Sequence, residues 1–345
     1  MLSLRLAVQS LVASLCIAAM CLSAAAAEQR LRIVAFNCEC LAAPGARTKL
    51  ERYRWDAARI GHLERVAALI ETLQPDIINL EEVVSVESID YLVNVLHEKG
   101  LTDYRGYHVE SHDTFTGFDV AMIARFQPDL VEGVSIRNIW SFSGDETWRE
   151  KYTYQDEAGN EQKRESSISR NALYYFTIRG QKLGFLGLHL KANPDDPAAN
   201  GQRQAESRVA QKVIRQEIVA RGYQPIVLGD LNDYDPDVPD QDESRSTKTP
   251  TLANLKDFEP MSPGPELVNA AVKIARQADR YSSHWDRNEN GVADSDDVFT
   301  MIDHVLLPKE LLPRVQRAFI SHLTDLHTSD HWPVVVDLAW DEAKQ

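Results

Sequence analysis

Short apolar segments that alternate with amphipathic helical patterns constrain the fold of this chain more than any other feature. Residues 31–36 (LRIVAF), 76–80 (DIINL) and 224–229 (QPIVLG) are apolar runs of strand length. Residues 55–73 lie between the first two runs, and their apolar side chains recur at helical spacing until Pro75 ends the pattern. Strands that alternate with helices are typical of layered α/β proteins. The sequence therefore predicts an α/β fold.

The same alternation continues along the chain. Residues 173–178 and 183–190 are strand-like runs separated by the polar segment RGQK, which predicts a β-hairpin. Two polar stretches, residues 138–170 and 233–250, interrupt the pattern and are expected to be surface insertions. No internal repeat or interdomain linker is evident, so we expect a single domain. Further strands are expected at residues 118–124, 301–307 and 333–338, and further helices at residues 89–99 and 202–220.

The N-terminus has the pattern of a secretory signal peptide. Arg5 is the only charged residue before Glu28, an apolar run covers residues 11–22, and SAAAA follows at residues 23–27. We expect cleavage after Ala27, which leaves residues 28–345 as the folded domain. The predicted protein is exported, either periplasmic or secreted, with no stable membrane insertion after cleavage.

Charge and cysteine content narrow the classes of site. The formal net charge is −15, so the chain cannot hold nucleic acid by general attraction and needs a local basic patch or bound cations. Cys38 and Cys40 remain after signal cleavage, two residues apart on one face of a predicted strand. Without neighbouring Cys or His they make a poor zinc site. We expect both to be small, half-buried packing residues.

Acidic, amide and histidine side chains collect where the predicted strands begin or end. Ligands gather at such positions in α/β sheets. Oxygen donors with histidines, and without a Cys/His cluster, favour Mg²⁺ or Mn²⁺ over structural zinc. The residues concerned are Asn37, Glu81, Glu82, His189, Lys191, Asp230, Asn232, Asp303, His304, Asp330 and His331.

The order of these motifs resembles the endonuclease/exonuclease/phosphatase superfamily, whose fold is DNase I-like. The resemblance spans Asn37 to His331, and its most specific pieces are G-D-x-N and S-D-H-x-P. It implies a four-layered α/β sandwich of two packed mixed β-sheets flanked by helices. The matching residues are Asn37, Glu82 in LEEV, His189 in HLKAN, Asp230 and Asn232 in GDLND, Asp303 in MIDHVLL, and Asp330 and His331 in SDHWPV.

The resemblance also implies roles in hydrolysis of a phosphoester bond. The divalent ion is expected on Glu82, with Asn37 and Asp330 as further ligands, while Glu81 is a neighbour. His331 is the expected general base for the attacking water. The other expected roles are water orientation by Asp230, phosphate contact by Asn232, phosphate contact or leaving-group protonation by His189, hydrogen-bond support by Asp303, and positive charge from Lys191 and Arg170. Lys191 is expected to face the same way as His189 on one strand.

One position departs from the family pattern. Family members often have an Asp after two apolar residues, which orients the base histidine, and the matching segment here is ELVNA with Asn269. An amide cannot stabilise an imidazolium ion by charge. Another acid, such as Asp257 or Asp279, is therefore expected to orient His331, unless the alignment fails in this segment.

A second motif lies between the catalytic segments. Residues 286–297 read D-x-N-x-N-G-x-x-D-x-x-D, the spacing of a calcium-binding loop with Asp in place of the last Glu. It resembles the calcium loops of EF-hand and dockerin-type modules, although flanking helices are not evident. We expect Ca²⁺ at Asp286, Asn288, Asn290, Asp294 and Asp297.

Three functional alternatives remain. The leading one is a nuclease acting on nucleic acid outside the cytoplasm. A sphingomyelinase-like enzyme or a phosphatase of small esters would share the fold, and a lipid enzyme should show an exposed aromatic or apolar loop, for which residues 140–148 are a weak candidate. A non-catalytic, calcium-dependent binding protein is disfavoured because Glu82, Asp230 and His331 are all present.

Overall fold

The computed structural model describes residues 30–49, 59–242, 249–288, 290 and 292–340. The predicted signal peptide, residues 1–27, lies outside these residues, so the expected export stays a prediction. In the part of the chain that is described, we find no helix of the length and apolarity that a membrane crossing requires.

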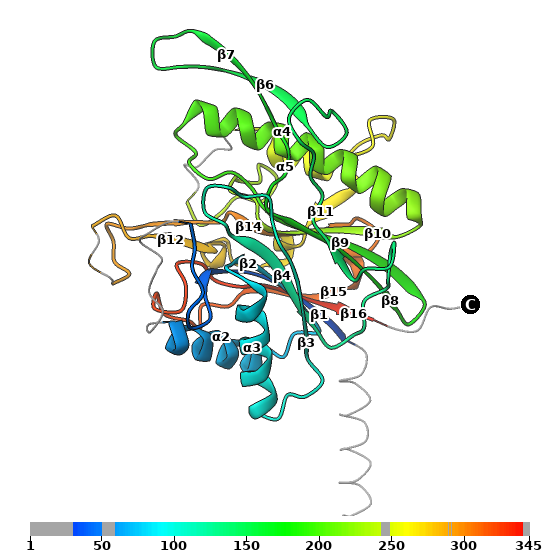
Figure 1. The fold of residues 1–345 in the computed structure, drawn as a ribbon, viewed down its shortest axis with the longest axis vertical. Coiled ribbons are helices and arrows are strands. Elements are labelled where there is room, and N and C mark those ends of the chain that lie inside the picture. Colours follow the sequence, from blue (N-terminus) through cyan, green and yellow to red (C-terminus); the bar gives the residue numbers. More distant parts are fainter. Residues whose placement is uncertain (1–29, 50–58, 243–248, 289, 291, 341–345) are drawn as a thin grey trace, which may run out of the picture.

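Two six-stranded mixed sheets form the centre of the molecule (Figure 1). The first sheet has the order β15 (Val315–Ile320), β16 (Val334–Ala339), β1 (Arg30–Leu41), β2 (Ile77–Val83), β4 (Asp119–Ala124), β3 (Arg105–Val109). The second has the order β11 (Leu267–Asn269), β14 (Asp303–Pro308), β10 (Gln224–Asp230), β9 (Gln181–His189), β8 (Asn171–Ile178), β5 (Ile136–Arg137).

Helices cover the outer face of each sheet. Helices α2 (Arg59–Leu73) and α3 (Val86–Glu98) lie on the first sheet, and α4 (Pro197–Val213) and α5 (Thr251–Lys256) lie on the second (Figure 1). One apolar cluster joins the two sheets, and a second and a third cluster lie under the two helical layers. The predicted four-layered α/β sandwich is confirmed.

The alternation of side chains along β1 explains why this strand is buried on both faces. Ile33 and Ala35 enter the cluster between the sheets, while Val34 and Phe36 pack beneath α2 and α3. Successive side chains of a strand point to opposite faces, so a continuous apolar run suits a strand covered on both sides.

Strand direction brings the polar ends of the motifs to one edge. β1 and β2 are parallel in the first sheet, and β9 and β10 are parallel in the second. Their carboxyl ends carry Asn37, Glu82, His189 and Asp230. β14 runs antiparallel to β10, so its first residue, Asp303, pairs with Asp230.

Most predicted elements agree with the structure, including the β8–β9 hairpin, but some boundaries differ and several strands, β3 and β15 among them, were not predicted. The helix predicted over residues 202–220 begins earlier, and α4 ends at Val213, followed by a π-helical turn (Ile214–Ile218) and a 3-10 turn (Val219–Arg221). β3 is an edge strand without a buried residue, so it has no apolar alternation.

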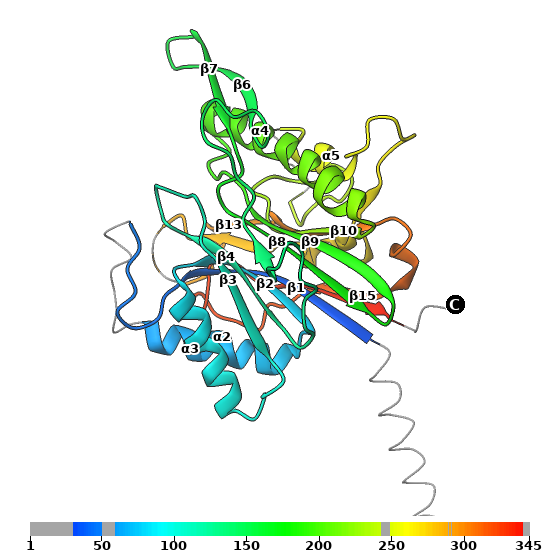
Figure 2. The same ribbon diagram turned by 45° about the vertical axis from the view of Figure 1, so that its right-hand side comes forward.

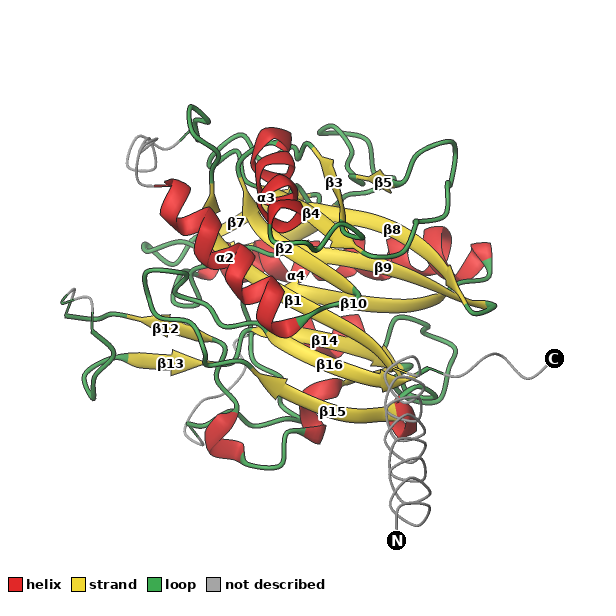
Figure 3. Cartoon of the chain, turned by 90° about the horizontal axis from the view of Figure 1, so that it is seen from below, coloured by secondary structure: helices red, strands yellow, loops and turns green. Residues whose placement is uncertain are grey.

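The first insertion and the calcium-loop-like segment extend from the sandwich. The expectation of a surface loop was wrong for residues 233–242, the first described part of the second insertion, because Asp233, Asp235 and Val238 are buried and Val238 packs in the core between the sheets. In the first insertion, β6 (Glu150–Gln155) and β7 (Glu161–Ser166) form a hairpin that projects beyond α4 (Figure 1 and Figure 2). The calcium-loop-like segment connects β12 (Ser283–Trp285) to β13 (Val298–Thr300), which form a separate two-stranded hairpin (Figure 3). The loop therefore lies between strands and not between helices.

Cys38 and Cys40 are fully buried, whereas half-buried positions were expected. Cys38 packs with the core beneath α2 and α3, and Cys40 packs with Val84 and Phe118 in a different cluster. The prediction of one shared face was wrong because the backbone leaves regular strand geometry at Glu39 and Cys40, whose φ angles are 46° and 59°.

Candidate active site

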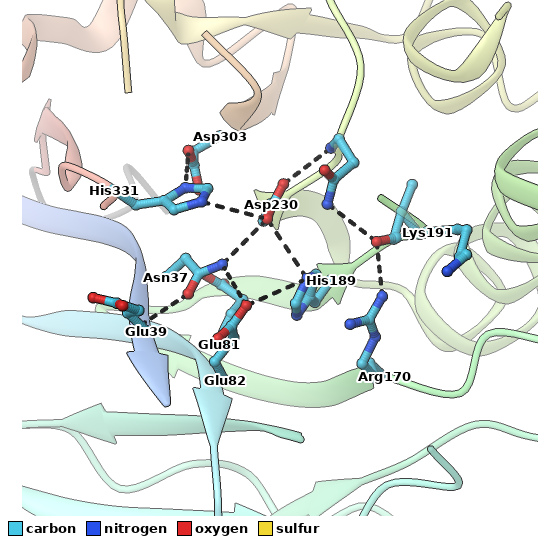
Figure 4. A network of polar contacts seen from close by, with 12 residues as sticks. Asn37, Glu39, Glu81, Glu82, Arg170, His189, Lys191, Asp230, Asp303 and His331 are labelled. Carbon is cyan, nitrogen blue, oxygen red and sulfur yellow. Dashed lines mark hydrogen bonds and ion pairs between the residues drawn. The ribbon is translucent and has the colours of Figure 1, made fainter. Parts of the chain in front are cut away.

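Three side chains from both sheets meet at the centre of the site (Figure 4). Asn37 Nδ2 lies 3.3 Å from Glu82 Oε1 and 3.2 Å from Asp230 Oδ2. The backbone carbonyl oxygen of Asn37 accepts a hydrogen bond from Ser329 Oγ at 2.8 Å. Asn37 thus connects a carboxylate of the first sheet to one of the second.

The two adjacent glutamates at the end of β2 point in different directions. Glu82 has a φ of 59° and its Oε2 accepts from the backbone N–H of Cys40 at 3.2 Å. Burial, followed by the negative charge of Asp330, raises the pKa of Glu82. Glu81 has no exposed surface and accepts a hydrogen bond from Asn79. Glu82 is therefore the glutamate that faces the site.

Gly229 makes room for Glu81 between the sheets. Its φ is +123°, and a Cβ there would clash with the Leu188 carbonyl oxygen and lie 2.7 Å from Glu81 Oε1. Burial, followed by the charges of Asp303 and Asp230, raises the pKa of Glu81 well above its usual range. The glycine of the GDLND motif is therefore required by packing.

His331 is held by a buried carboxylate. Its Nδ1 lies 2.8 Å from Asp303 Oδ2, and the same oxygen accepts from Ser282 Oγ at 2.7 Å. Burial alone lowers the pKa of His331, but the charges of Asp303, Asp330 and Asp230 outweigh burial and raise it well above its usual value. Asp303 fixes the ring so that Nε2 faces Asp230, 4.0 Å from its Oδ2 (Figure 4).

Asp303, and not Asp257 or Asp279, occupies the orienting position at His331. Asn269 instead binds a different histidine, because its Nδ2 lies 2.9 Å from His304 Nδ1 and 3.1 Å from Asp235 Oδ2. The asparagine at this position therefore leaves the carboxylate–histidine pair intact.

His189 and Asp230 lie side by side at the ends of β9 and β10. His189 Nε2 is 3.6 Å from Asp230 Oδ2, and its Nδ1 has no hydrogen-bond partner among the described residues. Burial, followed by the positive charge of Arg170, lowers the pKa of His189 well below its usual value, so the ring is neutral. Burial and the charge of Asp303 raise the pKa of Asp230 to about 7.

Asn232 and Arg170 converge on one carbonyl group. Asn232 Nδ2 and Arg170 Nη2 donate to the Leu190 carbonyl oxygen at 3.1 Å and 2.9 Å. The backbone N–H of Asn232 also donates to Asp230 Oδ1 at 3.1 Å. Both side chains therefore border the Asp230–His189 pair and can contact a phosphate group placed there.

We had expected Lys191 and His189 to share one strand face, but the structure shows that they do not. β9 ends at His189, and Lys191 lies in the following loop, apart from the His189–Asp230 pair in Figure 4. Its backbone N–H donates to Glu206 Oε2 at 2.9 Å, and its carbonyl oxygen accepts from Arg203 Nη1 at 2.7 Å. These contacts position the backbone of Lys191.

Sequence reasoning did not find several residues that support the site. Arg203 and Glu206 lie on α4, where their side chains look like those of an ordinary amphipathic helix, yet Arg203 is fully buried and lies 3.7 Å from Asp233. Ser329 could have been found as part of the S-D-H-x-P motif. Ser282 has no recognisable sequence signal.

Two groups of side chains could hold a cation. Asp230, Asp303 and His331 place one ligand atom each within 4.8 Å of one another. However, within this group His331 Nδ1 and Asp303 Oδ2 are already hydrogen-bonded to each other. We therefore interpret His331 and Asp303 as a candidate base with its orienting acid and not as metal ligands. The second group is the expected one of Glu82, Asn37 and Asp330: the two carboxylates offer hard oxygen atoms, and the charge of Asp330 raises the pKa of Glu82, a repulsion that a cation would relieve. Asn37 directs its Nδ2 toward Glu82. The Asp330 side chain is 52% exposed, so this second group is open to solvent.

The sequence profile that matches this chain is that of the Endonuclease/Exonuclease/phosphatase family, over residues 34–331. The chain belongs to this family. Its member enzymes are phosphoester hydrolases, and the matched residues include both sheets and the site described above. A comparison with curated proteins gave no significant match.

Solved structures of this family share the fold. The family protein from Leptotrichia buccalis is 15% identical with a TM-score of 0.55, and the match covers 89% of this chain and 98% of that protein. The 3′–5′ exonuclease NExo from Neisseria meningitidis is 15% identical with a TM-score of 0.55, covering 90% and 100%. TDP2 from Caenorhabditis elegans is 14% identical with a TM-score of 0.52, covering 90% and 74%.

Proposed function

We propose that this family member is an exported, divalent-metal-dependent nuclease that hydrolyses phosphodiester bonds. One observation carries the proposal: the His331–Asp303 pair faces Asp230 across from the Asn37–Glu82 pair, so a base and a candidate cation site border one space. The pattern of residues 1–27 supports export to the periplasm or the medium.

Glu82, Asn37 and Asp330 are the residues that would hold Mg²⁺ or Mn²⁺. A divalent ion supplies charge stabilisation for the anionic phosphoester and its leaving oxygen. Glu82 and Asp330 fit such an ion because both are carboxylates and burial already disfavours the negative charge of Glu82. Asn37 directs Nδ2 toward Glu82, while its Oδ1 accepts from the backbone N–H of Glu39, so its amide would turn to offer Oδ1 to the ion.

The side chains of the chain itself would move the proton and orient the phosphate. His331 Nε2 accepts the proton of the attacking water, and Asp303 holds Nδ1–H and stabilises the imidazolium that forms. Asp230 lies 4.0 Å from Nε2 and orients the water between them. Asn232 and Arg170 hold phosphate oxygens, and the neutral His189 contacts the phosphate on the same side.

Nucleic acid is the substrate class that we favour. The Neisseria NExo structure, which shares the fold at a TM-score of 0.53 and 15% identity, contains a product DNA hairpin. Arg170 provides positive charge at the site, which the acidic chain as a whole does not. A sphingomyelinase-like enzyme or a small phosphodiesterase of the same fold is the main alternative, and a non-catalytic binding protein is the other.

The first experiment is an activity assay on the purified protein with Mg²⁺ or Mn²⁺. Plasmid DNA, RNA, sphingomyelin and a bis-aryl phosphodiester are compared, with His331→Ala as the inactive control. Cleavage of DNA or RNA that is lost in His331→Ala supports the nuclease. Cleavage of lipid or of the small ester alone keeps the mechanism and rejects the substrate, and absence of any cleavage rejects the enzyme.

We also propose that the loop between β12 and β13 binds calcium. The observation that favours it is convergence: Asn288 Nδ2 and Asn290 Nδ2 lie 3.1 Å and 2.7 Å from Asp294 Oδ2, and Asn290 N donates to Asp286 Oδ1 at 3.1 Å. Asp297 Oδ2 accepts from the backbone N–H of Asp294 at 2.9 Å. Glu289 and Gly291 of this loop lie outside the described residues.

A calcium titration followed by thermal unfolding tests this loop. Ligand at about 100 times its Kd stabilises a folded protein by roughly 2.7 kcal/mol. We expect Asp286→Ala to abolish the rise in Tm caused by millimolar calcium. Asp296→Ala is the matched control, because Asp296 is not at a ligand position of the motif, and it should keep the rise. An equal rise in both variants would reject the calcium site.

A further inference from the structure

Three exposed or half-exposed aromatic side chains contact one another near the candidate active site; we call His112, Trp140 and Phe142 the aromatic rim. Phe142 is 74% exposed. The rings of His112 and Trp140 stack at 4.1 Å with an interplanar angle of 4°, and Trp140 meets Phe142 edge-on at 4.6 Å. Large exposed aromatic side chains that gather in one place indicate a binding surface.

Hydrogen bonds connect the aromatic rim to the site through one short segment. The backbone N–H of His112 donates to the Ser169 carbonyl oxygen at 3.2 Å, and Asn138 Nδ2 donates to the carbonyl oxygens of Ser169 and Asn171. Arg170 lies between Ser169 and Asn171 in the sequence, and its side chain donates to the Leu190 carbonyl oxygen that also accepts from Asn232. A group bound at Arg170 therefore lies next to the aromatic rim.

Charges of both signs lie near the aromatic rim. Arg170 lies at its inner end, and Lys49 is exposed and donates from Nζ to the carbonyl oxygen of Asp113, the residue after His112. At the outer end, the carboxylate of Glu165 accepts from Ser143 Oγ and from the backbone N–H of Gly144, next to Phe142.

A large groove that Asn232 helps to line, about 1410 Å³ in volume, is acidic. Two arginines line that groove against five carboxylates, those of Asp156, Glu157, Asp195, Asp196 and Asp242. The carboxylates of this groove outnumber its arginines, so a polyanion is disfavoured there.

We propose that the aromatic rim stacks an unpaired nucleobase adjoining the scissile phosphate, which makes single-stranded nucleic acid the preferred substrate. This inference rests on the proposed nuclease function and adds the substrate form. Aromatic side chains stack on any base because every base has a π face, whereas paired bases in a duplex keep their faces covered. Arg170 holds the phosphate while the aromatic rim holds the base beside it.

The test compares substrates with and without a base to stack. Steady-state kcat/KM is measured for a single-stranded oligonucleotide, the same strand with abasic positions, its duplex, and methyl p-nitrophenyl phosphate. We expect Phe142→Ala to lower the ratio of strand to small-ester kcat/KM about 5- to 150-fold, equivalent to roughly 1–3 kcal/mol at 1.4 kcal/mol per factor of ten. For the abasic strand, Phe142→Ala should lower kcat/KM by no more than it lowers kcat/KM for the small ester.

Trp285→Ala is the matched control, because Trp285 is an aromatic residue that is 62% exposed in the acidic groove. It should leave the ratio unchanged, and the Tm of each variant checks folding. A Phe142→Ala protein with the wild-type ratio, or a loss at Trp285 alone, overturns the proposal while the nuclease function stands. Loss of binding to sphingomyelin vesicles without loss on strands assigns the aromatic rim to a membrane and also overturns it. If the wild-type protein cleaves the small ester but no strand, the nuclease function itself fails.

Discussion

Replacing Asp303 with Asn tests the catalytic arrangement most directly, because the substitution keeps the shape of the side chain and removes its charge. Asp303 is fully buried, and its Oδ2 lies 2.8 Å from His331 Nδ1. A hydrogen bond to a charged group contributes about 1.5–3 kcal/mol, and each 1.36 kcal/mol changes a rate tenfold. We therefore expect kcat to fall about 10- to 150-fold with KM little changed.

The same substitution should move the pH dependence of the reaction. The charge of Asp303 raises the pKa of His331 against the opposing effect of burial. Without this charge the pKa of His331 falls. A general base must be unprotonated, so the rate rises with pH through the pKa of His331. The acid limb of the kcat/KM profile is therefore expected to move to lower pH in Asp303→Asn.

Ser282→Ala provides the control, because Ser282 Oγ donates to the same oxygen of Asp303 at 2.7 Å and the substitution keeps the carboxylate charge. This hydrogen bond is also made to a charged group and contributes up to about 3 kcal/mol, so kcat can fall as far as in Asp303→Asn. The acid limb should not move to lower pH, and this difference separates the two variants. Profiles are measured on a small phosphodiester at saturating Mg²⁺, with Tm as a folding check. An Asp303→Asn protein with the wild-type kcat and the wild-type acid limb would refute the assignment of His331 as the base.

Three further predictions concern the cation at Glu82, the packing of Gly229 behind the site, and the contact of Arg203 with the loop that carries Lys191. Glu82→Gln should raise the Mg²⁺ concentration for half-maximal activity at least about tenfold with an unchanged Tm, since a neutral amide is a weaker ligand; an unchanged Mg²⁺ requirement would exclude Glu82. Gly229→Ala should lower the unfolding free energy by about 2–4 kcal/mol in denaturant melts because its Cβ clashes with the Leu188 carbonyl oxygen, whereas Gly264→Ala, which also has positive φ but open space, should lose only about 1 kcal/mol. Arg203→Met should reduce kcat more than it reduces binding of a product mononucleotide, because Arg203 holds the Lys191 carbonyl; wild-type kcat in a folded variant would contradict this role.

The architecture follows from local sequence to a large extent. The apolar runs at β1, β2 and β10 are buried on both faces, so hydrophobicity alone locates them. The edge strand β3 and the β12–β13 hairpin carry polar or mixed residues, and pairing partners distant in the chain determine their conformation. Such elements have no periodic signal that sequence reasoning could use.

Some features of the candidate site could likewise be predicted from local sequence, and others could not. The motifs around Glu82, Asp230 and His331 predicted the chemistry, since carboxylates, an amide and a histidine at strand ends suit metal-assisted hydrolysis. The partner of His331 was not identified, because Asp303 and His331 are 28 residues apart and only the antiparallel pairing of β14 with β10 brings Asp303 beside Asp230. Asn269 stood at the expected sequence position but packs against His304.

By itself the sequence determined the α/β class, the family resemblance and the kinds of side chain available for hydrolysis, because periodicity and motif spacing are local properties of the chain. Only the tertiary structure decided which glutamate faces the site, which acid orients the base, where Lys191 lies and how the aromatic rim adjoins Arg170. These choices depend on strand register, on a positive φ at Glu82 and on contacts between segments far apart in the chain. A side chain's direction is a property of the backbone that carries it, and that backbone conformation is settled by packing.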